Sequence, residues 1–173
     1  QSLEATPSAD LLVKPEFTDI DTQPAQPVHL SQFTNAPDTD YAQAQARQTA
    51  QQALSQVRGQ LGQTYGSWVN GQYLPTETIV SSVNPSNPAE VVGHMGLINT
   101  DQADQAVAAA KAAFTTWRQT PASERIACLR RAGDLMTARR AELAAWVVLE
   151  VGKPLREADG EVSEAIDFCR YYA

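Results

Sequence analysis

The sequence EVGKPLREADGEVSEAIDFCRYYA, residues 150–173, contains the end of one predicted helix and the start of another. Gly152 follows the last apolar residue of a periodic segment, and Pro154 stands where the next segment begins, which is typical of helix ends and starts. Beyond Pro154, apolar residues recur at steps of three and four and predict one buried helical face. These residues are Leu155, Ala158, Val162, Ala165, Ile166, Cys169 and Tyr172. No helix-ending residue follows them, as expected of a fragment.

Glutamates form a neighbouring face of this predicted helix, at Glu157, Glu161 and Glu164. Like charges at this spacing repel each other by roughly a few tenths of a kcal/mol per pair. Glu164 lies at the border with the apolar face, one turn before Phe168. A carboxylate there is costly to bury unless it is paired or takes part in chemistry. Periodicity alone favours a structural role for Glu164 over a functional one.

The residues before this segment predict a helix and then short strands. An Ala- and Gln-rich helix is expected to start at Asp38 or Thr39 and to end at Gly62. The pair Asn70-Gly71 predicts a tight hairpin turn, because both residues accept a positive φ. Further strands are predicted at residues 78–83 and 90–95, separated by the prolines of NPSNP.

Three more helices are predicted before the last one. Their expected bounds are 101–118 with Thr100 as cap, a second starting at Thr120-Pro121, and a third near 141–151. The fold class that follows is a mostly helical α+β arrangement of helices and small antiparallel strands. Strands and helices do not alternate, so no parallel Rossmann-type sheet is expected.

Composition narrows the function classes. The 173 residues carry a net charge of −7, which disfavours nucleic acid and anionic membranes as partners. No apolar run is long enough for a membrane span, and no signal peptide is visible, so a cytoplasmic location is expected. Residues 1–33 are rich in proline and polar residues and are interpreted as a linker or tail, with a second region at 34–173.

No complete catalytic constellation is visible. Cys128 and Cys169 both lie in predicted helices and are expected to be buried and inert. His29 and His94 are too isolated to form a catalytic set. The sequence has no glycine-rich phosphate-binding motif. The arginines are expected to lie on solvated, salt-bridged faces; they are Arg125, Arg130, Arg131, Arg139 and Arg140.

Several ordered stretches, taken together, resemble one family. They are FTNAPDTDYAQAQARQTA, YGSWVNGQYLPT, SSVNPSNPAEVVG, AVAAAKAAFTTWRQTPASERIACLRRAGDLM and LEVGKPLREADGEVSEAIDFCRYYA. Residues 33–173 resemble the N-terminal part of an aldehyde dehydrogenase. Within that superfamily they resemble L-glutamate γ-semialdehyde (Δ1-pyrroline-5-carboxylate) dehydrogenases. Residues 1–32 resemble the linker that follows the proline dehydrogenase barrel in bifunctional proline utilization A proteins.

The resemblance implies the N-terminal helices and small strands of an NAD-binding domain. In the family, the semialdehyde is oxidised to glutamate through a thiohemiacetal on a catalytic cysteine, with reduction of NAD. The resemblance places that cysteine, the water-activating glutamate, the oxyanion asparagine and the NAD-binding loop in later residues than these. This segment is therefore expected to be inactive alone and not to bind NAD. The implied partners are the remainder of the dehydrogenase domain, a preceding proline dehydrogenase domain, and further copies in a homo-oligomer.

The resemblance also assigns site residues. Glu164, with Phe168 on the same helix, matches the family position beside the aldehyde in the substrate tunnel. Glu150, with the carbonyl groups of Ser82 and Val83, matches a monovalent-cation site, and oxygen ligands suit such a hard cation. Without the later sheet, the faces around three aromatic residues are expected to be partly bare; they are Trp117, Trp146 and Phe168.

A different class of function stays open at the level of sequence. The alanine-rich stripes also suit a non-catalytic helical interaction module that docks a partner protein. A cooperative melt of a monodisperse chain would favour the module, and self-association through bare faces would favour the fragment.

Overall fold

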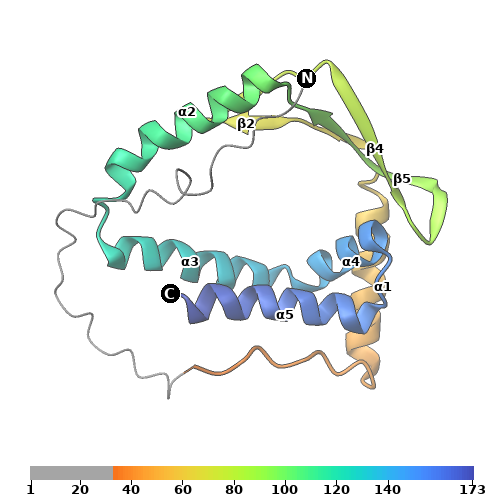
Figure 1. The fold of residues 1–173 in the computed structure, drawn as a ribbon. Coiled ribbons are helices and arrows are strands. Elements are labelled where there is room, and N and C mark those ends of the chain that lie inside the picture. The colour runs from red at the N-terminus through yellow and green to blue at the C-terminus, as the bar shows by residue number, and fades with distance from the viewer. Residues whose placement is uncertain (1–32) are drawn as a thin grey trace, which may run out of the picture. The chain divides into compact units, whose positions relative to one another are not determined.

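Helices dominate the computed structural model, which describes residues 33–173. The elements in chain order are α1 (Ala44–Arg58), β1 (Gln63–Tyr65), β2 (Ser67–Val69), β3 (Gln72–Leu74), β4 (Thr78–Asn84), β5 (Asn87–Leu97), α2 (Thr100–Trp117), α3 (Ala122–Ala138), α4 (Arg140–Val151) and α5 (Leu155–Tyr171). Figure 1 shows α5 lying along α3, with α1 at the far end of the helical layer. The predicted mostly helical α+β fold is confirmed. The linker predicted for residues 1–33 and its His29 lie outside the described residues, except for Phe33.

The first helix starts later than the sequence predicts. Its first residue is Ala44 rather than Asp38 or Thr39. The Thr39 amide and hydroxyl both donate to Asp159, and the Asp40 carboxylate accepts from the Ala42 amide. These bonds hold the chain in a turn, so the helix begins only after it.

The strands form a hairpin and a three-stranded sheet. In the hairpin, β2 pairs with β3 across Asn70 and Gly71, whose φ angles of 51° and 73° confirm the predicted turn. In the sheet, β5 lies between β4 and β1. Its pairing with β4 is antiparallel, as predicted, but its pairing with β1 is parallel. The sequence pattern does not predict β1, because a strand of three exposed residues shows no alternation of apolar and polar residues.

The hairpin between β4 and β5 is tighter than predicted. Strand β5 begins at Asn87, so Pro88 lies inside it rather than before it. Asn84 pairs with Asn87 at the turn, and Pro88 is only the second residue of the strand, where a missing amide donor is tolerated. A register shift at Ser82 and Val83 interrupts the ladder in β4.

Helix α2 is the least covered helix. Asn99, not Thr100, is its N-cap: the Asn99 side chain accepts from the Gln102 amide, and the Gln102 side chain accepts from the Asn99 amide. No residue of α2 is buried, and its main contact is with β2. Val107, Phe114 and Trp117, which recur at helical spacing, are all exposed.

Helix α4 connects two small cores. On one side Ala145 and Leu149 pack against Ala53 and Val57 of α1. On the other side Ala144 packs against α5, where the buried residues are Ala158, Val162 and Ile166. The predicted apolar face of α5 is thus confirmed for its central residues, while Tyr172 at its end is exposed.

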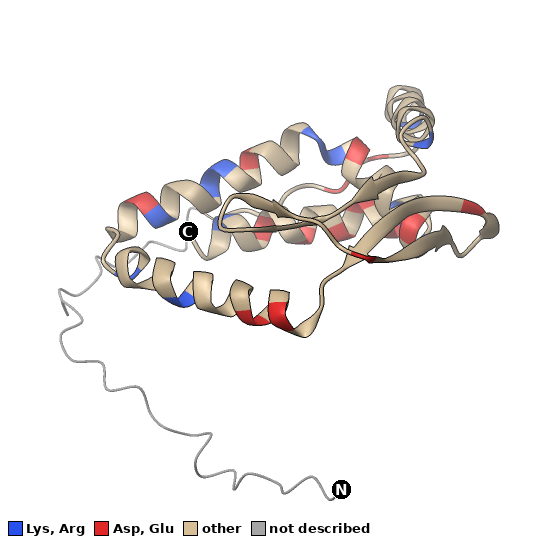
Figure 2. Cartoon of the chain, turned by 90° about the horizontal axis from the view of Figure 1, so that it is seen from above, with Lys and Arg blue, Asp and Glu red and all other residues tan. Residues whose placement is uncertain are grey.

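Charged residues are spread over the helices. Figure 2 shows Lys and Arg interspersed with Asp and Glu, with few charges on the strands. No helix of the described part, residues 33–173, is long and apolar enough to cross a membrane.

Candidate functional site

Glu164 and Phe168 line one pocket of about 510 Å³ at the C-terminal half of α5. Both side chains are exposed, although the sequence pattern places Glu164 at the border with the apolar face of the helix. Aromatic rings and carboxylates line most of the pocket; besides Glu164 and Phe168, these are Phe33, Tyr171, Tyr172, Asp38 and Asp167. Such a lining suits a small ligand with a cationic group and an apolar portion.

One wall of this pocket comes from residues 33–39, which we call the arm. The arm has no helix or strand, yet Phe33, Ala36 and Thr39 are half-buried at steps of three. Ala36 packs against the core between α4 and α5. The Phe33 ring lies edge-on to Tyr171, with 5.5 Å between the ring centroids. The arm is therefore held along α5 rather than free in solvent.

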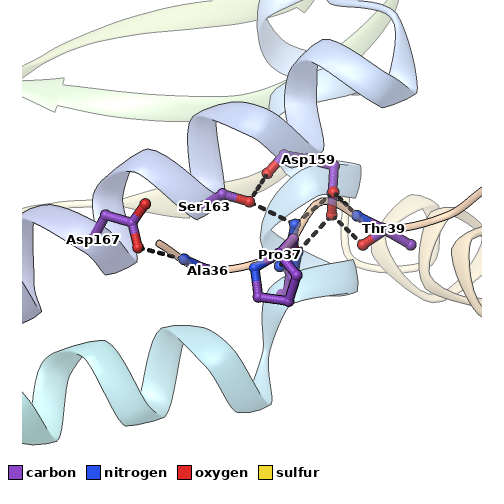
Figure 3. A network of polar contacts seen from close by, with 7 residues as sticks. Ala36, Pro37, Thr39, Asp159, Ser163 and Asp167 are labelled. Carbon is purple, nitrogen blue, oxygen red and sulfur yellow. Dashed lines mark hydrogen bonds and ion pairs between the residues drawn. The ribbon is translucent and has the colours of Figure 1, made fainter. Parts of the chain in front are cut away.

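Polar side chains of α5 fix the arm along its length. The Asp167 carboxylate accepts from the Ala36 amide at 2.7 Å and from the Asn35 side chain at 2.8 Å. Asp159 accepts from the Thr39 amide at 3.0 Å and from its hydroxyl at 2.9 Å. Figure 3 shows these carboxylates pointing from α5 toward the arm, with Ser163 between them.

Arg140 completes this network from the start of α4. Its guanidinium donates to both Asp159 oxygens at 2.7 Å, to the Pro37 carbonyl at 2.7 Å and to the Ser163 hydroxyl at 2.5 Å. The prediction that Arg140 lies on a solvated face is therefore wrong. Its side chain is only 17% exposed and forms a largely buried ion pair with Asp159. A fork of donors matched to a carboxylate explains why an arginine occupies this position.

The network shifts several ionisation equilibria. Burial acts to raise the pKa of Asp159, but hydrogen bonds from Arg140 and Thr39 outweigh it and hold that pKa below its usual value. The hydrogen bond to Asp159 raises the pKa of Arg140. Burial, with the nearby Asp159 charge, raises the pKa of Tyr41. Asp159 and Arg140 are therefore both charged at neutral pH.

Asp159, Ser163 and Asp167 were not predicted from the sequence as functional residues. They recur at four-residue spacing along one side of α5, beside the apolar face. Small polar residues at that spacing, together with the Asn-Ala-Pro-Asp-Thr stretch of the arm, were the available signal.

A second pocket, of about 500 Å³, contains two of the three predicted cation ligands. Ser82 of β4 and Glu150 of α4 both line it, together with the paired Arg139 and Glu142. Val83 is not part of the lining. The end of α4 is brought to the sheet by Gly152, whose φ of 73° ends the helix against Pro85. Within residues 33–173, no group of three or more His, Cys, Asp or Glu side chains is placed to hold a metal ion.

The cysteines and the remaining histidine lie apart from both pockets. Cys128 is exposed and Cys169 is half-buried, so the prediction that both are buried is wrong. Cys128 lies in the first half of α3, residues 122–130, where every residue except Ile126 is exposed. His94 and Ser81 share one hydrogen bond across the sheet, with 3.0 Å between the His94 Nδ1 and Ser81 Oγ atoms.

The fold agrees with the comparison to known proteins. The sequence profile of the aldehyde dehydrogenase family matches residues 68–173, more than half of the chain. The chain therefore belongs to the aldehyde dehydrogenase family.

Several similar proteins carry the name 1-pyrroline-5-carboxylate dehydrogenase. The 1-pyrroline-5-carboxylate dehydrogenase of Bacillus pumilus is 41% identical over 141 residues, which cover 82% of this chain and 27% of the relative. Among solved structures, 1-pyrroline-5-carboxylate dehydrogenase from Thermus with bound NAD has a TM-score of 0.78 and 39% identity, covering 81% of this chain and 27% of that one. Proline utilization A from Bdellovibrio bacteriovorus has a TM-score of 0.80 and 40% identity, covering 86% of this chain and 15% of that one. The chain thus spans little more than a quarter of the curated relatives it matches.

Proposed function

We propose that this chain is the N-terminal segment of an NAD-dependent dehydrogenase that oxidises L-glutamate γ-semialdehyde to glutamate in proline catabolism. The observation that carries the proposal is the pocket shared by Glu164 and Phe168, in a chain about 40% identical to proteins named 1-pyrroline-5-carboxylate dehydrogenase. The similarity to proline utilization A supports a parent that also has a proline dehydrogenase domain. A homo-oligomeric, cytoplasmic enzyme is part of the same proposal.

In this proposal, α5 contributes to substrate binding. The semialdehyde carries an ammonium and a carboxylate, and the Glu164 carboxylate attracts the ammonium or orients a water molecule. Phe168 supplies an apolar wall beside it, half exposed at 51% in this chain. The two side chains bind and orient, and they do not perform the covalent step.

The described residues do not fit the second substrate, NAD. A dinucleotide site needs a glycine-rich turn between a strand and a helix, where backbone amides approach the phosphates. The nearest equivalent here is the connection from β5 to α2, whose residues Ile98 and Asn99 include no glycine. We therefore assign NAD to the rest of the parent enzyme and derive no step through it.

Ser82, Val83 and Glu150 are proposed as part of a monovalent-cation site. Backbone carbonyl oxygens and one carboxylate suit a hard cation. The location of Ser82 and Glu150 in one pocket supports this assignment. Further oxygen ligands would have to come from elsewhere in the parent.

The test compares variants of the full-length parent with NADH formation as readout. Glu164→Gln removes the charge without changing the size of the side chain, and we expect a loss of about tenfold or more in kcat/KM for L-glutamate γ-semialdehyde. Glu157→Gln is the matched control, because Glu157 is exposed on the same helix but outside the pocket. Equal effects of the two substitutions would contradict the role of Glu164.

A second test uses the 173-residue chain itself. We expect it to form no NADH from the semialdehyde and NAD, because the proposal assigns the nucleophile to later residues. Turnover by the isolated chain that depends on a cysteine would contradict this. A cooperatively unfolding, monodisperse chain with a specific protein partner would instead favour the rival function, a helical interaction module.

A further inference from the structure

The arm is the part of the pocket that the proposed function does not yet use. Of the pocket lining, Phe33, Asn35, Ala36 and Asp38 belong to the arm, and the rest belongs to α5 and to Tyr172, which follows it. The pocket is therefore a space between two segments more than one hundred residues apart in the sequence. Its width depends on how closely the arm is held to α5.

The hydrogen bonds that hold the arm against α5, and so set the width of the pocket, are few and strong. Asp167 is the only described side chain that bonds the arm at Asn35 and Ala36, and it lies one residue from Phe168 on α5. Asp159 and Arg140 fix the other end of the arm, at Thr39 and Pro37. Bonds to a charged acceptor are about twice as strong as bonds between neutral groups. The arm has no secondary structure that would hold it in place without them.

We propose that the arm is a specificity-determining wall of the substrate pocket and that Asp167 is the positioning residue that sets it. Asp167 acts through the Ala36 amide and the Asn35 side chain, not by touching the reacting atoms. This inference rests on the proposed function, because it assumes that the pocket at Glu164 and Phe168 receives the semialdehyde.

The expected kinetic signature follows from where the arm lies. We expect it to bound the side of the pocket without touching the reacting carbon, so it should contribute equally to binding in the ground state and in the transition state. Loss of such uniform binding raises KM and leaves kcat unchanged. A residue that merely supports folding would instead lower the amount of active enzyme and therefore the apparent kcat.

The first variant is Asp167→Ala in the full-length parent. We expect KM for L-glutamate γ-semialdehyde to rise about tenfold while kcat stays within about twofold. Hydrogen exchange should become faster at the Ala36 amide and stay slow at the Thr39 amide, because only the first loses its acceptor. Asp134→Asn is the control, since Asp134 is an acidic residue of α3 outside the pocket, paired with Arg170 at 3.7 Å.

A second pair of variants tests the contact without removing a side chain. Asn35→Asp alone places two carboxylates together and should raise KM. Combining it with Asp167→Asn reverses donor and acceptor, so the bond reforms and KM should return toward the wild-type value. This rescue also provides a folded variant if Asp167→Ala does not accumulate.

The outcomes separate the two proposals. A wild-type parent that forms no NADH from the semialdehyde would overturn the proposed function, and this inference with it. Normal wild-type turnover with an unchanged KM in Asp167→Ala and Asn35→Asp would overturn the inference alone, even if Ala36 exchanges faster. A raised KM with rescue in the reversed pair would support it.

Discussion

Arg140 and Asp159 form a bidentate ion pair, with both nitrogen–oxygen distances at 2.7 Å. The pair joins α4 to α5 and also binds the arm through Thr39 and Pro37. The neighbouring residue Arg139 makes an equally bidentate pair with Glu142, but in solvent. Two consecutive arginines thus provide a comparison of a buried and an exposed ion pair in one helix start.

We expect Asp159→Asn to lower the free energy of unfolding by about 3 kcal/mol, because it leaves the Arg140 charge largely buried without its partner. Glu142→Gln is the matched control and should have little effect, since water screens the exposed pair. The unfolding free energies of both variants can be measured by urea unfolding of the 173-residue chain, monitored by circular dichroism. Similar losses in the two variants would contradict the importance of burial.

The same pair predicts how stability depends on pH. The folded-state pKa of Asp159 is lowered, so this carboxylate stabilises the fold above the unfolded-state pKa of about 3.9. Its contribution is lost as the pH falls from that value through the lower folded-state pKa. Wild-type chain should therefore lose unfolding free energy on acidification more steeply than Asp159→Asn. Parallel pH profiles for the two proteins, measured by thermal unfolding, would be the contrary result.

Two glycines inside helices give a third prediction. A Cβ atom at Gly133 would lie 3.3 Å from the Cys169 Cβ atom, because α3 and α5 approach closely there. A Cβ atom at Gly160 would meet nothing within 4 Å. Gly160→Ala should therefore stabilise the chain by about 0.5–1 kcal/mol through helix propensity. Gly133→Val should destabilise it by about 1–3 kcal/mol through overpacking. Thermal unfolding of the two variants tests this prediction. A Gly133→Val variant more stable than the wild-type chain would refute the close approach of α3 and α5.

The elements that the sequence predicts well are those whose pattern is local. The Asn70-Gly71 turn follows from backbone preferences alone, and its positive φ angles are confirmed. The apolar face of α5 follows from residue spacing, and Ala158, Val162 and Ile166 are indeed buried. Local patterns fix which elements form, since each depends on residues a few positions apart.

The contacts that the sequence does not predict are non-local. The arm and α5 are joined through Asp167 and Ala36, which are 131 residues apart. Asp159 resembles any exposed acidic residue until Arg140 is brought beside it by the packing of α4 on α5. For the candidate site, Glu164 and Phe168 were assigned from the family resemblance and not from spacing. Their roles, like those of Ser82, Val83 and Glu150, stay predictions.

The proposed cation site gives a fourth prediction. In the full-length parent, Glu150→Gln removes the one carboxylate of the site and should abolish stabilisation by sodium. The wild-type melting temperature should rise when choline chloride is replaced by sodium chloride at equal ionic strength, because a ligand that binds only the folded state stabilises it. The control is Glu142→Gln, which changes a carboxylate in the same pocket that already pairs with Arg139. Sodium dependence that survives in Glu150→Gln would contradict the assignment.

The bare surface of α2 gives the last prediction. Val107, Phe114 and Trp117 are between 48% and 58% exposed, although they have the spacing of a buried helical face. Apolar side chains on one helix face with no cover promote association. The isolated chain should therefore scatter more light as its concentration rises, and Phe114→Gln with Trp117→Gln should reduce this scattering without lowering the unfolding free energy.

A substitution in the hydrophobic core provides the comparison for the α2 double variant. Leu149→Ala removes a side chain that is 1% exposed, so it should lower the unfolding free energy by about 2–5 kcal/mol and increase the scattering. If the α2 double variant behaves like Leu149→Ala, these aromatic residues support the fold of the chain itself. If it stays stable and scatters less, they form a surface that packs against something outside residues 33–173. In the proposed parent that partner is the remainder of the dehydrogenase domain, and the same two substitutions there should destabilise the enzyme, because the face is then covered.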